Sequence, residues 1–102
     1  MHEYYTYITT NFSKTTLYTG VTNNIIRRLE EHQEVAVNGG KSFVGRYKCF
    51  WLVYWEEFQY IDNAIAREKE IKGWSRAKKE QLIATINPEW KFLNEDVGCT
   101  IA

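Results

Sequence analysis

Two short tyrosine-bearing segments and the stretch after them contain the residues best suited to chemistry. The segments are Tyr5-Thr6-Tyr7 and Tyr18-Thr19-Gly20, and Arg28 and His32 follow four residues apart, so a helix would place them on one face. A phenol, a guanidinium and an imidazole can together orient water, hold a phosphate and move a proton. This combination points to a site that cuts phosphodiester bonds.

A carboxylate further along the chain is the second candidate for chemistry. Glu68 shares helical spacing with the apolar positions Ile61, Ala64, Ile65 and Ile71. A carboxylate on a core-facing stripe is costly unless something pairs with it. Its partner is either internal, such as Arg67, Arg28 or a buried tyrosine hydroxyl, or it is a divalent metal ion. The helix pattern alone favours neither.

Two strands must position the tyrosines. Residues 4–10 and 15–21 are rich in β-branched and aromatic side chains, and residues 11–14 between them include turn formers, so the pair is predicted to be an antiparallel hairpin. Tyr7 and Tyr18 then lie on neighbouring strands. They share a face only in some registers, and the sequence does not specify the register.

The stretch that carries Arg28 has the signals of a helix. Residues 22–24 offer cap side chains before an apolar stripe, and the helix is predicted to run to about Gln33, with Arg27 pairing with Glu30 or Glu31. Residues 38–42 form the clearest loop. Residues 43–48, which mix cations with aromatic rings, are expected to be a mobile arm that faces nucleic acid.

The second half of the chain completes an α+β fold. Residues 50–58 show no alternation of polarity until Glu56, which predicts an inner strand covered on both faces. Asp62 is expected to cap a helix that stops at a left-handed Gly73, and Ser75 to cap another that Pro88 ends. The predicted order is β-β-α-β-α-α, with a small three-stranded, mainly antiparallel sheet flanked by helices.

Length and composition predict a single domain that folds alone. The chain has 102 residues, 44% hydrophobic and 16% aromatic; residues 1–96 are assigned to the domain and 97–102 to a loose tail. No apolar run suits a membrane span or a signal peptide, so a cytoplasmic location without a membrane partner is expected. Cys49 and Cys99 are isolated thiols and do not suggest zinc.

The charges balance overall but cluster locally. The chain has 13 basic and 13 acidic residues, yet six cations lie between residues 67 and 79 against two acids. This cluster is either a nucleic-acid-facing surface or an ordinary solvated helical face. The candidate nucleic-acid contacts are Arg46, Lys48, Lys72, Arg76, Lys78 and Lys79, together with Gly20, whose bare backbone allows close approach to a ligand or to the following helix.

Taken in order, these motifs resemble the GIY-YIG nuclease domain superfamily over nearly the whole chain. The two tyrosine segments occupy the positions of the two tripeptides that characterise the family, and Arg28 follows Tyr18 by ten positions, as the arginine of the family helix does. His32 matches a position where several members carry histidine. The run over residues 64–74 is similar to the small single-domain bacterial (UPF0213-like) members, and Glu68 falls where the family keeps its metal-binding glutamate.

The resemblance implies a metal-dependent endonuclease, with DNA favoured over RNA and with low intrinsic sequence specificity unless a protein partner supplies it. Glu68 would hold one Mg²⁺ or Mn²⁺ and Arg28 would clamp phosphate. Tyr7 would act as base or orient the water, Tyr18 would position phosphate or water, and His32 would assist proton transfer. Which tyrosine plays which part stays open.

One departure from the family pattern affects substrate ordering. Many members place an asparagine three residues after a late proline, and the residue after Pro88 at that spacing is Lys91. Asn94 lies off the pattern and is assigned no role. Two rival functions therefore accompany the nuclease: a catalytically inactive nucleic-acid-binding module of the same fold, and a protein-interaction domain whose exposed aromatic side chains form a dimer surface.

Overall fold

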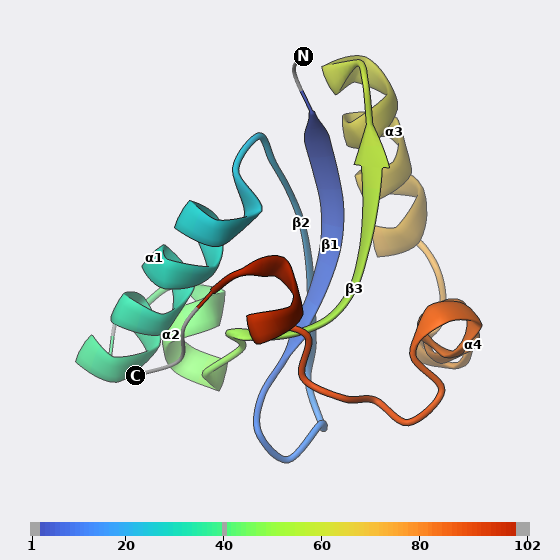
Figure 1. Cartoon of the computed structure of the whole chain (residues 1–102). Helices are drawn as coiled ribbons and strands as arrows, with labels where there is room; N and C mark the ends of the chain where they lie inside the picture. The colour runs from blue at the N-terminus through green and yellow to red at the C-terminus, as the bar shows by residue number, and fades with distance from the viewer. Residues whose placement is uncertain (1–2, 40, 100–102) are drawn as a thin grey trace.

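A computed structural model of the chain describes residues 3–39 and 41–99. Its centre is a three-stranded antiparallel sheet in the order β2-β1-β3, with β1 at Tyr4–Thr10, β2 at Leu17–Thr22 and β3 at Trp51–Phe58 (Figure 1). Helices flank the sheet on both sides. The α+β fold with a small antiparallel sheet is confirmed.

The sheet has its first strand in the middle, so the prediction that residues 50–58 form an inner strand is wrong. β3 is an edge strand, and its apolar residues reflect two covered faces, which an edge strand can also have. The chain end closes its open edge, because Leu93 N–H donates to Leu52 O at 2.7 Å and the Asn94 side chain pairs with Leu52 N–H at 2.7 Å and Phe50 O at 2.8 Å. Asn94 therefore has a structural role.

The hairpin of β1 and β2 places both tyrosines on one face of the sheet. Tyr7 lies opposite Gly20, and Tyr18 lies opposite Thr9, two residues away on each strand. The turn is held by the Asn11 Oδ1, which accepts from the backbone N–H groups of residues 15 and 16 at 2.8 and 3.0 Å. Arg76 ties the turn to the rest of the molecule through the carbonyls of residues 14 and 15, at 2.9 and 2.8 Å.

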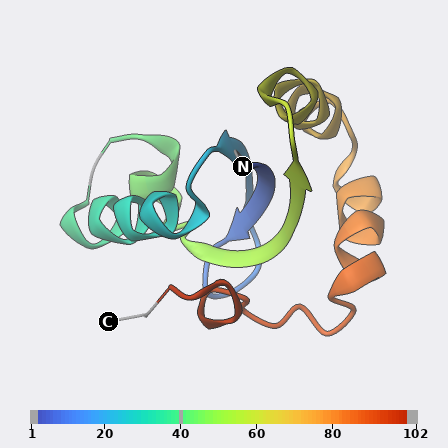
Figure 2. The ribbon, with the colours of Figure 1, turned by 45° about the horizontal axis from the view of Figure 1, so that its top comes forward.

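Two helical layers sandwich the sheet. α1 (Ile25–Asn38) and α2 (Phe43–Tyr47) lie on one side, and α3 (Ile61–Lys72) and α4 (Arg76–Ile86) lie on the other (Figure 2). The molecule has a hydrophobic core on each face of the sheet, and successive residues of β1 point into different cores. Tyr7 packs on the α1 side, and Ile8 packs on the side of α3 and α4. The first core contains Tyr7, Ile25, Leu29, Leu52 and Cys99, and the second contains Ile8, Val53, Tyr54, Ile71 and Ile83.

The first helical layer is longer and more ordered than predicted. Asn24 caps α1, as the capping signal indicated, but the helix continues past Gln33 to Asn38 and ends at Gly39, whose φ is 70°. The expected mobile arm is instead the five-residue helix α2, capped by Ser42 at one end and by a left-handed Lys48 at the other. These caps satisfy the backbone of a helix too short to show a periodic pattern.

Both helices of the second layer form where the sequence pattern predicts them, but the caps of α3 differ from the prediction. Ser75 caps α4 as predicted, with its side chain accepting from Lys78 N–H. Tyr60 precedes α3, so Asp62 lies inside the first turn, where its charge favours the positive helix end. The φ of Gly73 is −80°, so the predicted left-handed stop is wrong.

The chain end belongs to the core further than expected. A single 3₁₀ turn, η1 (Glu95–Val97), precedes Cys99, which is 1% exposed and packs in the first core cluster. The loose tail predicted from residue 97 is therefore wrong for residues 97–99, and residues 100–102 lie outside the described residues. Within the described part of the chain, none of the helices is long and apolar enough to cross a membrane.

Candidate active site

Tyr7 lies at the centre of the site, and Gly20 makes room for it. The Tyr7 side chain is fully buried, and a Cβ at position 20 would lie 2.5 Å from its hydroxyl oxygen and 2.6 Å from Cζ. Real Cβ contacts are never so close, so only glycine fits there while Tyr7 keeps its place. The bare backbone of Gly20 thus receives a tyrosine ring, and its predicted contact with nucleic acid stays untested.

Three rings meet beside the free edge of the sheet. Tyr7 and Tyr18 have their ring centroids 6.3 Å apart, and His32 lies 5.8 Å from the first ring and 5.4 Å from the second. The Tyr7 hydroxyl is 3.3 Å from His32 Nε2. The register of the hairpin and the position of His32 on the buried face of α1 therefore bring together three of the predicted site residues.

Burial decides the protonation of Tyr7 and His32. It raises the pKa of Tyr7, and the nearby Tyr18 and Glu68 raise it further, whereas Arg28 acts in the opposite direction. Burial also lowers the pKa of His32 to about 4, with the Arg28 charge as a second cause. At neutral pH Tyr7 keeps its proton and His32 is uncharged, so the phenol can donate a hydrogen bond to a lone pair on Nε2.

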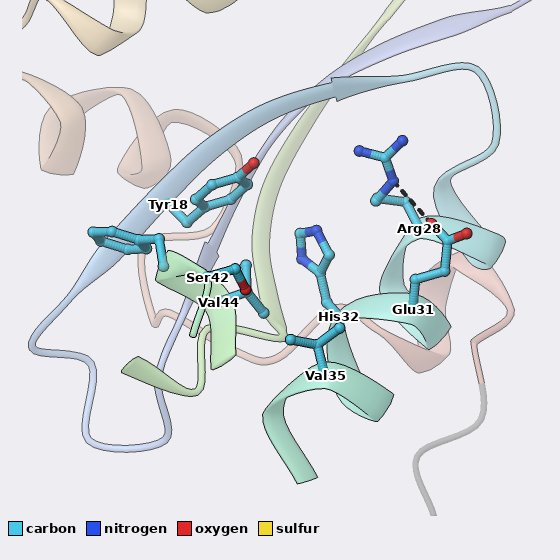
Figure 3. A pocket seen from close by; sticks show the side chains of 8 residues that line it. Tyr18, Arg28, Glu31, His32, Val35, Ser42 and Val44 are labelled. Carbon is cyan, nitrogen blue, oxygen red and sulfur yellow. Dashed lines mark hydrogen bonds and ion pairs between the residues drawn. The ribbon is translucent and has the colours of Figure 1, made fainter. Parts of the chain in front are cut away.

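Arg28 borders a pocket of about 390 Å³ next to these rings. Its Nε contacts Glu31 Oε1 at 3.1 Å, and the rest of the guanidinium points past His32 (Figure 3). The predicted pairing of Arg27 with Glu30 or Glu31 is not found; Arg27 contacts the Asn23 side chain at 3.2 Å instead. The remaining wall of the pocket comes from Tyr18, Val35, Ser42, Phe43 and Val44.

The pocket contains two features that the sequence did not reveal. Glu31 stands three residues after Arg28, which is a helical pairing distance, but Arg27 offered an equally good partner at four residues. The wall from α2 was missed because residues 43–48 were expected to be an arm.

Glu68 lies at the margin of the core and has a different partner from those predicted. Its side chain is 15% exposed, and Lys72 Nζ contacts its Oε2 at 3.0 Å. Arg67 is instead engaged by Glu56 at 3.0 Å and Glu70 at 2.6 Å. The Glu68 charge is the smallest of the influences on the pKa of the Tyr7 phenol, which it raises from α3 on the opposite side of the sheet.

The candidate nucleic-acid cations do not form one free surface. Arg46 and Lys48 belong to α2 on one side of the sheet, and the other four lie on α3 and α4 on the opposite side (Figure 2). Several make contacts within the chain: Lys48 Nζ donates to Ala36 O, Lys72 pairs with Glu68, Arg76 holds the hairpin turn and Glu80, and Lys78 Nζ lies 4.3 Å from the centroid of the Trp74 ring. Arg46 is exposed, and Lys79 is partly exposed.

Comparison with known proteins identifies the family to which the chain belongs. Residues 3–81 match the family described as the GIY-YIG catalytic domain. A UPF0213 protein of Natronomonas pharaonis is 49% identical over 69 residues, covering 68% of this chain and 78% of the relative, and one of Syntrophus aciditrophicus is 40% identical over 92 residues, covering 87% and 98%. The solution NMR structure of the UPF0213 protein BH0048 from Bacillus halodurans has a TM-score of 0.55 and 30% identity, covering 96% of this chain and 99% of that one.

The chain therefore belongs to the GIY-YIG family, which places it in an endonuclease superfamily. Within that family it is similar to the small UPF0213 proteins, as the run over residues 64–74 indicated.

Proposed function

We propose that this protein is a metal-dependent endonuclease that hydrolyses phosphodiester bonds, with DNA favoured over RNA. The observation that carries the proposal is the contact of Tyr7 with His32 next to a pocket bordered by Arg28, with Glu68 close enough to act on the same phenol. The proposal assigns proton transfer to Tyr7 and His32, phosphate binding to Arg28 and the metal to Glu68, and the membership of the chain in a nuclease superfamily supports it.

The proton chemistry falls to Tyr7 and His32. Tyr7 holds its proton at neutral pH and is therefore not a phenolate before the reaction. The attacking water passes a proton to the Tyr7 phenol oxygen while the phenol passes its own proton to His32 Nε2. The water oxygen forms a bond to phosphorus, and the bond from phosphorus to the leaving sugar oxygen breaks with its electron pair on that oxygen, which then takes a proton from solvent water. The negative charge of the substrate phosphate favours the imidazolium that results.

Arg28 suits the charge that builds on the phosphoryl oxygens. A guanidinium has five donors in a planar fork, and Glu31 engages only the Nε side at 3.1 Å. Arg28 also donates a hydrogen bond to the Tyr7 phenol, and the other donors of the fork are assigned to oxygen atoms of a phosphate. Glu31 thereby orients the fork, and Tyr18 offers its hydroxyl to the phosphate or to the water from the opposite wall of the pocket (Figure 3).

The donor set at Glu68 suits a single hard cation. The part of the chain that is described has no group of three or more histidine, cysteine or acidic residues that could hold a metal ion. Mg²⁺ and Mn²⁺ do not require such a cluster, because these ions keep several waters and bind through one or two carboxylates plus phosphate oxygens. When bound, the ion would stabilise negative charge on the phosphoryl group. Glu68 is the residue that would hold it.

The rest of the molecule suits binding with low sequence specificity. Arg46, which is exposed, and Lys79, which is partly exposed, offer charge to phosphates, which carry no sequence information. Among residues 3–39 and 41–99, no separate element resembles a base-reading module such as a zinc finger, and the proposal assigns sequence preference to a partner protein.

Cleavage assays on paired arginine variants test this proposal. Labelled duplex, single-stranded and branched DNA and RNA are incubated with the protein and Mg²⁺, Mn²⁺ or a chelator. Arg28→Ala is expected to lower the cleavage rate at least about 100-fold, and the neighbouring Arg27→Ala, which removes the same charge away from the pocket, to leave it within about threefold. Tight nucleic-acid binding with no metal-dependent cleavage of any substrate would favour the inactive binding module instead.

A further inference from the structure

The ion pair between Glu68 and Lys72 occupies the carboxylate that the metal would need. The two residues are one helical turn apart on α3, and Lys72 Nζ lies 3.0 Å from Glu68 Oε2. Lys72 is the ion-pair partner of Glu68 in the described part of the chain. An ammonium and a divalent cation seek the same oxygen lone pairs, and each repels the other.

The two side chains of this pair differ in solvent exposure. The Glu68 side chain is 15% exposed and is held at the margin of the core, whereas that of Lys72 is 51% exposed and lies at the end of a flexible stem. Arg67, on the same helix, is fixed by two carboxylates and by the Trp74 ring. Lys72 can therefore swing away while Glu68 stays in place.

We propose that Lys72 is a built-in competitor of the metal: it neutralises Glu68 in the metal-free protein and must leave before a divalent cation binds. This inference rests on the proposed role of Glu68 as metal ligand. It explains how one half-buried carboxylate can lie near the Tyr7 phenol without a metal, because the ammonium offsets a charge that would otherwise be poorly solvated. The pair can open from the Lys72 end, because that side chain is 51% exposed and water can solvate its ammonium once it has left Glu68.

Metal binding in the absence of nucleic acid tests the inference directly. Binding of Mn²⁺ is measured by titration calorimetry and by loss of the free-ion EPR signal, for the wild type, Lys72→Met and Lys69→Met. Lys69 is exposed on the same helix, so its change is a matched control for charge and helix propensity. Lys72→Met is expected to bind Mn²⁺ about tenfold more tightly than the wild type, and Lys69→Met to stay within about twofold, because repulsion between charges falls off quickly in water.

A third variant separates failure of this inference from failure of the proposed function. Glu68→Gln is expected to abolish binding of Mn²⁺ both alone and combined with Lys72→Met. If Glu68→Gln abolishes binding but Lys72→Met binds no more tightly than the wild type, the competition is refuted and the metal site stands. If no Mn²⁺ binding depends on Glu68 in any variant, both the metal site and the competition are refuted. Circular dichroism confirms that each variant is folded.

Discussion

At the scale of single residues, the site depends on the absence of one side chain and on the burial of another. Gly20 leaves the space that the Tyr7 ring fills, and the buried ring then meets His32. The resemblance predicted Tyr7, Tyr18, Arg28 and His32 as one group. It could not predict their contacts, because these depend on the register of a hairpin that no local pattern specifies.

Gly20→Ala is predicted to disable the site while the protein still folds. The added methyl would overlap the Tyr7 hydroxyl, so the ring must shift and lose its contact with His32. We expect cleavage to fall at least about 100-fold and the free energy of unfolding to fall by about 1–3 kcal/mol. Single-turnover cleavage and thermal unfolding measure the two effects. Gly73→Ala, where the nearest backbone oxygen is 3.5 Å from the new carbon, is the control; equal activity of both variants would contradict this account.

Stability between pH 4 and 7 is predicted to report on His32. Its pKa falls from 6.5 to about 4 on folding, so between these values the unfolded chain binds the proton more readily than the folded protein. The stabilisation is fully present above about pH 6.5 and is lost as the pH falls towards 4, by up to about 3 kcal/mol. Urea unfolding at a series of pH values measures it. His32→Gln should lose most of this pH dependence; an unchanged slope would show that other groups cause it.

At the scale of elements, short segments and strand edges were the hardest to predict. The apolar run of β3 indicates that both faces of this strand are covered. It does not indicate whether the strand lies inside the sheet or at an edge that the end of the chain covers. The five-residue α2 is too short for a periodic signal. The partner of Glu68 was also beyond the sequence, because Glu56, from a distant strand, takes Arg67 and leaves Lys72 to pair with Glu68.

Asn94→Ala is predicted to open the edge of β3. The change removes one acceptor and one donor that serve Leu52 N–H and Phe50 C=O, at a side chain that is 1% exposed. Leaving such groups without partners costs about 2–4 kcal/mol in total. Denaturant unfolding measures the loss, and Asn63→Ala on the exposed side of α3 is expected to stay within about 0.5 kcal/mol. A loss below about 1 kcal/mol for Asn94→Ala would mean that water satisfies this edge.

At the scale of the whole molecule, zero net charge means that nucleic acid is attracted by a few local cations. The sequence predicted a basic cluster over residues 67–79, and the fold keeps it on the side of α3 and α4, apart from Arg46 and Lys48 on the opposite side of the sheet. Part of the cluster is used internally, as with Arg76 in the hairpin turn. The composition could not show this division, because it arises from the layer to which each helix belongs.

The salt dependence of binding to duplex DNA is predicted to be shallow and to identify the free cations. With three or four phosphate contacts, the logarithm of the binding constant should fall with a slope of about −3 against the logarithm of salt concentration. Arg46→Ala on the exposed side of α2 should make the slope shallower by about one unit, whereas Arg76→Ala should leave the slope unchanged and lower stability. Fluorescence anisotropy titrations measure this, and the reverse order of effects would overturn the assignment.

Cleavage by Glu68→Gln is the most direct test of the central claim, that this fold places a metal-dependent hydrolytic site at the edge of its sheet. Gln preserves the size of Glu68 and removes its charge, and Glu57→Gln on the exposed side of β3 is the matched control. The account predicts metal-dependent cleavage by the wild type and by Glu57→Gln, and a loss of at least about 100-fold for a folded Glu68→Gln at every Mg²⁺ or Mn²⁺ concentration. Undiminished cleavage by Glu68→Gln would contradict it.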